Sequence, residues 1–132
     1  MTTKNIKQIA ILGCPPEGGY EAWMDSEKHG EMIGGSAKIE NKIGGKFNIW
    51  DGAVTGETLE LDPKKYKIVQ SWRYEYDDWP KDVPSKITLE FVSYNSGCKL
   101  RFLQSDVPEK YAEEVAQGWK DYYWKPMQEY FG

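Results

Sequence analysis

The C-terminal stretch from Glu109 to Phe131 constrains the fold more than any other part of the sequence. Its large apolar side chains recur three or four residues apart, which places them on one side of an α-helix. Such a helix would be roughly 35 Å long, comparable with a β-strand of about nine residues. Because an apolar helix face needs a cover, we expect the helix to lie on a sheet, with room for a hollow between the two. The recurring side chains are Val115, Trp119, Tyr122, Tyr123, Met127 and Tyr130.

The segment between Ser36 and Ser105 has the alternation of apolar and polar residues that is typical of antiparallel strands. Asp51-Gly52 and Asn95-Ser96-Gly97 are turn signals between these strands. The apolar parity changes across Gly56, which predicts a β-bulge or a sharp bend there. With the opening strand the sequence predicts seven strands, around residues 4–12, 38–42, 46–50, 54–61, 66–74, 87–91 and 98–102.

Two short helices are predicted between the first strand and the second. Pro15 and Pro16 end the strand and suit a helix start, because proline lacks a backbone N–H and its φ angle is compatible with a helix. Asp25 or Ser26 can cap the second helix, and Gly34-Gly35 ends it. The first helix places Tyr20, Trp23 and Met24 on one side.

Three further local signals concern a loop and the last helix. Residues 77–84 contain two prolines and several acidic residues, which predicts an exposed loop with an exposed Trp79. Within the last helix, Gly118 predicts either close packing or a weak point. Pro126 predicts a kink, because proline removes one helical hydrogen bond.

The composition indicates one domain, residues 1–132, and narrows the class of partner. The chain has 17 basic and 21 acidic residues that are scattered along it, so we expect no nucleic-acid surface. Its longest apolar stretches are too short to cross a bilayer and no leader precedes them, so we expect no membrane insertion and a cytoplasmic location.

The reactive side chains do not form a catalytic or metal-binding motif. Cys14 and Cys98 are far apart in the sequence and lack metal-type spacing, so we expect free thiols in a reducing compartment, unless the fold brings them together as a disulfide. His29 is the only histidine, and we expect it at the surface or at a helix end; the alternative is a pH-sensitive group at a cavity mouth. We therefore predict no catalytic residue, no metal and no cofactor.

Three motifs together are typical of a known family. They are Gly44-Gly45-x-Phe47-x-x-Trp50-x-Gly52-x-x-x-Gly56, then Ile68-Val69-Gln70-Ser71-Trp72-Arg73, and finally Gly118-Trp119-x-x-Tyr122-x-Trp124-x-Pro126-Met127. Over nearly its whole length the chain resembles single-domain relatives of the C-terminal domain of the activator of the ninety-kilodalton heat-shock protein ATPase. That family lies within the START-like (SRPBCC) superfamily, which includes birch-pollen-allergen-like proteins.

The resemblance implies an α+β helix-grip fold. In this fold a curved seven-stranded antiparallel sheet wraps around a long C-terminal helix, two short helices close one end, and a cavity lies between. Relatives in the superfamily bind lipids and other apolar molecules or cyclise polyketides, whereas the chaperone activator stimulates an ATPase through protein contact. The full-length activator also carries a separate N-terminal domain, for which this sequence has no room, and this difference argues against direct chaperone activation.

The favoured hypothesis is a non-catalytic domain that binds a small apolar or amphipathic molecule in this cavity. Gln70 would bring an amide into an apolar space, where it needs a protein or ligand partner. A solidly packed aromatic core is the alternative to a cavity. A chaperone-linked interaction module, marked by an exposed patch at Trp79 or at Tyr130-Phe131, is the second hypothesis, and a cyclase or hydrolase is the third. The candidate cavity residues are Phe47, Gln70, Trp72, Phe91, Phe102, Trp119, Tyr123 and Met127.

Overall fold

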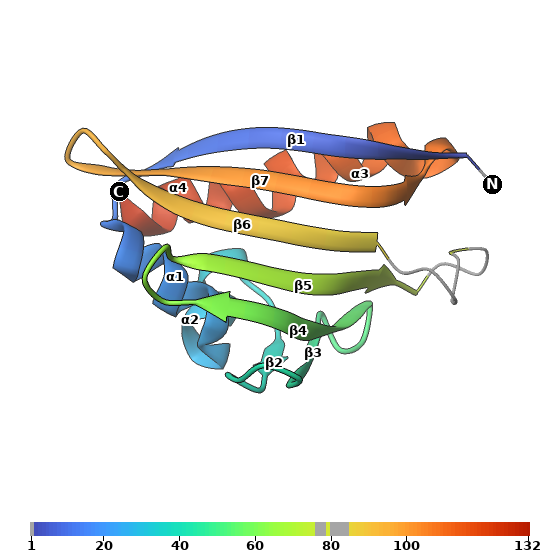
Figure 1. Ribbon diagram of the computed structural model, residues 1–132, viewed down its shortest axis with the longest axis horizontal. Coiled ribbons are helices and arrows are strands. Elements are labelled where there is room, and N and C mark those ends of the chain that lie inside the picture. Colours follow the sequence, from blue (N-terminus) through green and yellow to red (C-terminus); the bar gives the residue numbers. More distant parts are fainter. Residues whose placement is uncertain (1, 76–78, 80–84) are drawn as a thin grey trace.

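The computed structural model describes residues 2–75, 79 and 85–132 and consists of one curved sheet covered on one side by helices (Figure 1). Two short helices lie between the first two strands, as the sequence predicts. The strands are β1 (Thr3–Leu12), β2 (Ala37–Ile39), β3 (Lys46–Ile49), β4 (Val54–Asp62), β5 (Lys67–Tyr74), β6 (Ser85–Tyr94) and β7 (Gly97–Pro108). The helices are α1 (Pro16–Met24), α2 (Ser26–Ile33) and a C-terminal series: η1 (Glu109–Tyr111), α3 (Ala112–Trp119), η2 (Lys120–Trp124) and α4 (Lys125–Phe131).

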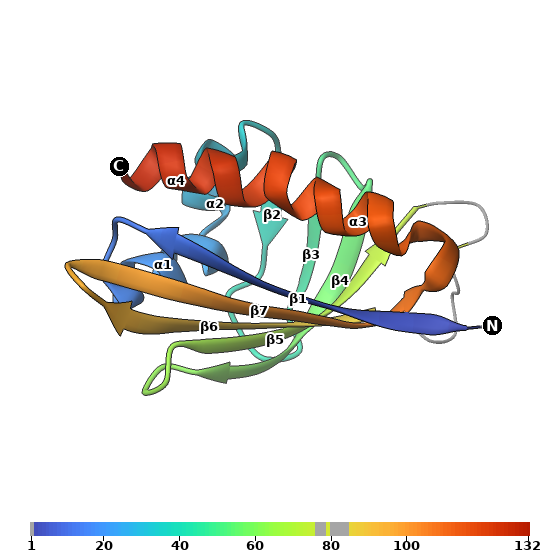
Figure 2. The ribbon, with the colours of Figure 1, turned by 90° about the horizontal axis from the view of Figure 1, so that it is seen from above.

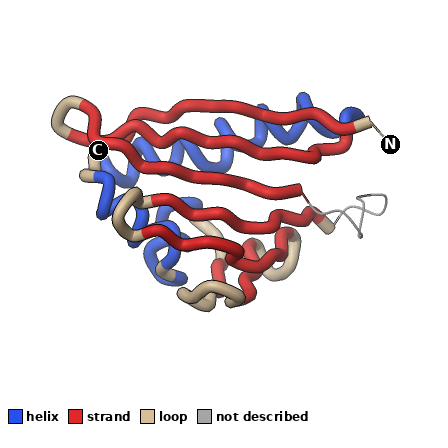
Figure 3. The backbone as a smooth tube through the Cα atoms, in the orientation of Figure 1, coloured by secondary structure: helices blue, strands red, loops and turns tan. Residues whose placement is uncertain are grey.

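The sheet is antiparallel throughout and has the strand order β1-β7-β6-β5-β4-β3-β2. The C-terminal helical series runs along the covered side, from α3 beside the N-terminal end of β1 to α4 beside α2 (Figure 2). In Figure 3 the helices pass behind the strands. The predicted helix-grip architecture, with its seven strands, long C-terminal helix and two short helices, is confirmed.

The bulge in β4 lies three residues beyond the predicted position. The register of β4 against β5 shifts between Thr58 and Glu60 and not at Gly56. Gly56 has a different role, since a Cβ atom there would lie 2.0 Å from the carbonyl oxygen of Ser71 and 2.5 Å from the ring of Phe47. Gly56 therefore allows two strands and an aromatic ring to approach closely, and this explains why a glycine is present although the bulge lies elsewhere.

The last helix contains an irregularity next to Pro126, where the sequence predicts a kink. It is a π-helical turn, η2, which immediately precedes the first turn of α4 that contains this proline. A π turn shifts the hydrogen bonding to more distant carbonyls and thereby accommodates a residue without an N–H. The expectation of close packing at Gly118 is wrong, because a Cβ atom there would meet only Tyr122, at 3.7 Å.

The core lies between the inner face of the sheet and the helices, and it includes Trp79. The predicted exposure of Trp79 is wrong, since its side chain is only 2% exposed. Its ring lies 4.9 Å from that of Tyr74 and 5.7 Å from that of Tyr111. The indole is therefore an anchor between β5 and the start of the last helix. The other residues of the predicted loop, 77, 78 and 80–84, lie outside the described part of the chain.

Candidate functional site

A cavity of ≈ 270 Å³ lies between the C-terminal helix and the β3–β5 side of the sheet, and we call it the helix–sheet cavity. One wall comes from α3 and η2, where successive turns of the helix present side chains to the sheet. The other wall comes from the β3–β4 turn and the end of β5. The lining residues are Glu114, Val115, Gly118, Trp119, Tyr122 and Tyr123 on the helix, and Trp50, Ala53, Val54, Trp72 and Tyr74 on the sheet.

Three of the predicted cavity residues line the helix–sheet cavity, namely Trp72, Trp119 and Tyr123. The others are buried in the core and do not line it. These others are Phe47, Gln70, Phe91, Phe102 and Met127. The interface between the sheet and the C-terminal helix is therefore a packed core in one part and a cavity in another.

Trp23 fills the middle of the space between helix and sheet. Its side chain projects from α1 and is fully buried. The centre of its ring system lies 5.0 Å from that of Tyr123, 6.3 Å from Trp72 and 6.5 Å from Trp119. The sequence places Trp23 on one side of a short helix but not in the site. An aromatic residue on the inner side of a short helix that closes a sheet has to be buried, and this signal identifies it.

Three buried or partly buried indole N–H groups each donate a hydrogen bond to a glutamine on a strand. Each glutamine oxygen accepts from one tryptophan, and the strands involved are β5, β7 and β1. The side-chain amide of Gln70 also donates to Thr58 Oγ1 at 3.2 Å, so its expected partners are protein atoms. The pairs are Trp23–Gln70 at 3.0 Å, Trp119–Gln104 at 2.7 Å and Trp124–Gln8 at 2.6 Å.

Trp72 differs from these three tryptophans. Its side chain is buried, yet its Nε1–H has no hydrogen-bond partner among the described residues. A buried donor without a partner costs about 1–3 kcal/mol. Trp72 also lines the helix–sheet cavity, so this unpaired donor belongs to a residue of the cavity wall.

His29 lies behind Tyr123 in the core and is 1% exposed, so the prediction of a surface position is wrong. Its Nδ1 is 2.7 Å from the carbonyl oxygen of Trp23, and its Nε2 is 2.8 Å from the hydroxyl of Tyr123. Since a carbonyl only accepts, Nδ1 carries the proton, and the Tyr123 hydroxyl donates to Nε2. Neither ring nitrogen is left to act on a molecule in the cavity.

Burial keeps the side chains of His29 and Tyr123 uncharged. Loss of water contact lowers the pKa of His29 to about 4, against the smaller opposing effect of the Trp23 carbonyl. Burial likewise raises the pKa of Tyr123 well above its usual value. Both side chains are therefore neutral near pH 7.

The fold brings the two cysteines together. Cys14 and Cys98 are buried free thiols whose Sγ atoms are 3.9 Å apart. The contact with Cys98 lowers the pKa of the Cys14 thiol, and the same contact, with burial, raises the pKa of Cys98. Of the two thiols, Cys14 therefore loses its proton at the lower pH.

Residues 13–132 match the model of the family described as "Activator of Hsp90 ATPase homolog 1-like protein". The chain belongs to this family. Curated relatives include the "Activator of 90 kDa heat shock protein ATPase homolog" of Dictyostelium discoideum, which is 32% identical over 90% of this chain. The human "Activator of 90 kDa heat shock protein ATPase homolog 1" is 33% identical over 89% of this chain. The aligned regions are only 30% and 34% of those two proteins, so this chain spans about a third of their length.

Solved structures agree with the assignment to the Hsp90 ATPase activator family. An HSP90 activator from Plasmodium falciparum has a TM-score of 0.79 at 27% identity and covers 90% of this chain and 89% of its own. Ara h 8.0201 has a TM-score of 0.76 at 12% identity and covers 98% of both chains. The second likeness concerns the fold alone.

Two further properties of this family member concern metals and membranes. Across residues 2–75, 79 and 85–132, no three histidine, cysteine or acidic side chains are grouped closely enough to hold a metal ion. Within the same residues, no helix combines the length and the apolar character needed to cross a bilayer.

Proposed function

We propose that this chain is a non-catalytic interaction domain that docks on a heat-shock chaperone of the ninety-kilodalton class. The observation that carries the proposal is the family match, which spans residues 13–132 and includes relatives named as activators of that chaperone's ATPase. The filled interior around Trp23 is compatible with it, because most of the helix–sheet interface is occupied by protein side chains. Function then depends on an outer surface.

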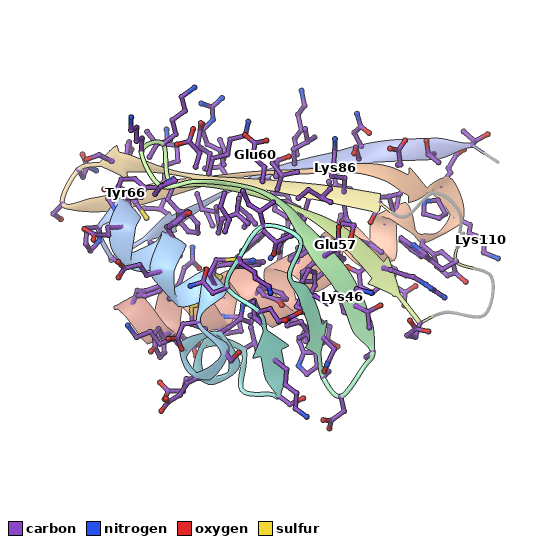
Figure 4. All side chains as sticks on the ribbon, turned by 60° about the horizontal axis from the view of Figure 1, so that its bottom comes forward. Lys46, Glu57, Glu60, Tyr66, Lys86 and Lys110 are labelled. Carbon is purple, nitrogen blue, oxygen red and sulfur yellow. The ribbon has the colours of Figure 1, made fainter. Side chains whose placement is uncertain are left out.

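The outer face of the sheet offers such a surface, which we call the outer-face patch. Figure 4 shows side chains with nitrogen or oxygen ends, among them Lys86 and Glu60, on the side of the sheet that faces away from the helices. Near the β6–β7 turn this face also exposes apolar side chains around Lys99 and Arg101. Cross-strand register places Lys99 between Ile11 and Val92. The exposed apolar members are Ile9, Ile11, Val92 and Tyr94.

Arg101 is paired with Glu90 at 3.3 Å and Lys99 Nζ lies 4.5 Å from the centre of the Tyr94 ring, so the patch is apolar with charges of both signs beside it. Such a patch suits a partner surface that is apolar at its centre. At the other expected contact, Tyr130-Phe131, the hydroxyl of Tyr130 donates a hydrogen bond to Glu31 at 3.2 Å. The patch expected at Trp79 is absent from the described surface, because that side chain is buried. We therefore place the chaperone contact on the outer-face patch.

The test compares two isoleucines of equal exposure. Ile9 and Ile43 are both 62% exposed, but Ile43 lies in the β2–β3 connection outside the patch. Ile9→Ser should weaken binding to the organism's own chaperone by roughly tenfold, in keeping with the burial of one large apolar side chain. Ile43→Ser should leave binding unchanged. Calorimetry and the chaperone's ATPase rate measure both effects; an equal response of the two variants, or no binding by the wild type, contradicts the proposal.

A second candidate function is binding of a small apolar or amphipathic molecule in the helix–sheet cavity. Two observations favour it: the ≈ 270 Å³ volume and the unpartnered Nε1–H of Trp72. The volume is close to the lower end of the range for ligand pockets, which suits a small molecule and not a long lipid. Native mass spectrometry of freshly purified protein tests this candidate, and a panel of small amphipathic compounds that gives no shifts at Trp72 or Trp119 would count against it.

The remaining parts of the proposal concern catalysis and location. A cyclase or hydrolase stays the third hypothesis, because both ring nitrogens of His29 are already bonded within the protein. A cytoplasmic location is supported by the two free thiols, which persist in reducing compartments.

A further inference from the structure

Aromatic rings dominate the walls of the helix–sheet cavity. Six of its described lining residues are aromatic. At the mouth, the ring of Trp50 lies 6.1 Å from Tyr122 and 5.8 Å from Tyr123, at interplanar angles of 73° and 74°. Tyrosine rings that stand nearly perpendicular to an indole form a corner in which faces of different rings can contact one bound group. Such corners favour cations, because the faces of aromatic rings carry negative potential.

The charge at the cavity is negative. Glu114, an exposed residue of α3, is the one charged side chain among the described lining residues, and none of them is basic. A carboxylate beside aromatic faces attracts a cation, repels an anion and adds little for a neutral molecule. The net charge of −4 acts in the same direction.

One lining residue of the cavity, Trp72, has a hydrogen-bond donor that is unpaired within the described part of the chain. The Nε1–H of Trp72 is buried and has no partner among the described residues, whereas three other indole N–H groups of this protein are paired with glutamines. A ligand oxygen that reaches Trp72 would satisfy this donor. The oxygen has to be uncharged, because Glu114 disfavours a negative group.

We infer that the helix–sheet cavity selects a small organic cation: a methylated or quaternary ammonium group with an uncharged oxygen a few bonds away. The ammonium group lies in the corner of Trp50, Tyr122 and Tyr123 near Glu114, and the oxygen accepts from Trp72. This inference rests on the second candidate function, ligand binding in the same cavity, and names the chemical class of the ligand.

The experiment uses choline and its neutral isostere 3,3-dimethylbutan-1-ol, which differ in charge but hardly in shape. Both are titrated to millimolar concentration into the whole chain and followed by tryptophan fluorescence and calorimetry. Choline should bind at least about fivefold more tightly, as expected for one partly exposed charge interaction together with cation–π contacts. Glu114→Gln should remove most of that preference. Glu113→Gln is the matched control, because Glu113 is exposed on the same helix and does not line the cavity.

Trp72→Phe tests the proposed hydrogen bond from Trp72 to the ligand oxygen. It removes the N–H and should lower the affinity for both compounds by a similar factor, since both carry a hydroxyl oxygen. Circular dichroism confirms that the variant is folded. Unchanged affinities would overturn the assignment of Trp72 as the donor.

The remaining outcomes separate the inference from the function on which it rests. Equal affinities for the two compounds, with no effect of Glu114→Gln, would overturn the cation assignment and leave ligand binding in the cavity standing. If neither compound binds, but other small amphipathic molecules do, the inference also fails alone. Absence of binding by every compound tested overturns both.

Discussion

Moving from pH 7 to pH 5 should lower the free energy of unfolding by about 2 kcal/mol through His29 alone. The imidazole is buried between the Trp23 carbonyl and the Tyr123 hydroxyl, and burial lowers its pKa to about 4 from 6.5. The unfolded chain therefore takes up the proton first as the pH falls. The stability is complete above about pH 6.5, is lost progressively as the pH falls toward 4, and is not lost further below that.

The magnitude follows from the two pKa values. Their difference corresponds to about 3 kcal/mol when the whole range is crossed. At pH 5 the unfolded imidazole is almost fully protonated and the folded one almost fully neutral, which accounts for about 2 kcal/mol relative to pH 7. Since the side chain is 1% exposed, solvent screening does not reduce this figure much.

Urea unfolding at several pH values, followed by tryptophan fluorescence, measures the effect. The control is His29→Gln, whose amide can donate to the Trp23 carbonyl and accept from Tyr123 but does not titrate. The difference in unfolding free energy between wild type and variant should change by about 2 kcal/mol between pH 7 and pH 5. Subtraction of the variant removes the contribution of the carboxylates.

Because His29 is the only histidine, its ring signals in an NMR titration give an independent measurement. A titration midpoint near 6.5 in the folded protein would refute the reasoning, as would a wild-type-minus-variant difference that does not change with pH.

Four other perturbations have expected outcomes. Diamide should join Cys14 to Cys98, whose Sγ atoms are 3.9 Å apart, and stabilise the fold by roughly 4 kcal/mol less any strain; two titratable thiols after treatment would contradict this. Trp23→Ala should lower the free energy of unfolding by about 3–5 kcal/mol, measured in urea, because it empties the centre of the core. Gly118→Ala should stabilise the helix by about 0.5–1 kcal/mol, since the new methyl group meets nothing closer than 3.7 Å. Gly56→Ala should destabilise the protein instead, because its Cβ would lie 2.0 Å from a carbonyl oxygen, and a pair of equal melting temperatures would contradict both glycine predictions.

The order of the elements could be predicted from the sequence because local signals set it. Turn glycines and prolines mark the strand ends, and the spacing of apolar residues identifies the last helix. Three of the candidate cavity residues, Trp72, Trp119 and Tyr123, were found for the same reason, since they lie on the inner faces of predicted elements.

The positions of His29 and Trp23 could not be predicted, because they depend on contacts between residues that are distant in the sequence. His29 was predicted at the surface or at a helix end because no catalytic or metal-binding motif accompanies it, and only the packing of α2 against η2 brings it to Tyr123, 94 residues away. The partner of Trp23 is likewise 47 residues away. The apolar side of α1 can be read from the sequence, but the distance that Trp23 reaches between helix and sheet depends on the packing, and that distance determines how much of the cavity is filled.

The three indole–glutamine pairs fix the position of the helices on the sheet. They tie α1, α3 and η2 to β5, β7 and β1, so a slip of the helix by one residue would break several buried hydrogen bonds at about 1–3 kcal/mol each. None of the three pairs reaches β2, β3 or β4. The β3–β4 hairpin, which carries Trp50, is held instead by the backbone ladder of β4 on β5 and by its buried residues Phe47, Ile49 and Val54, so a change at Trp50 reaches the cavity wall without breaking an indole–glutamine pair.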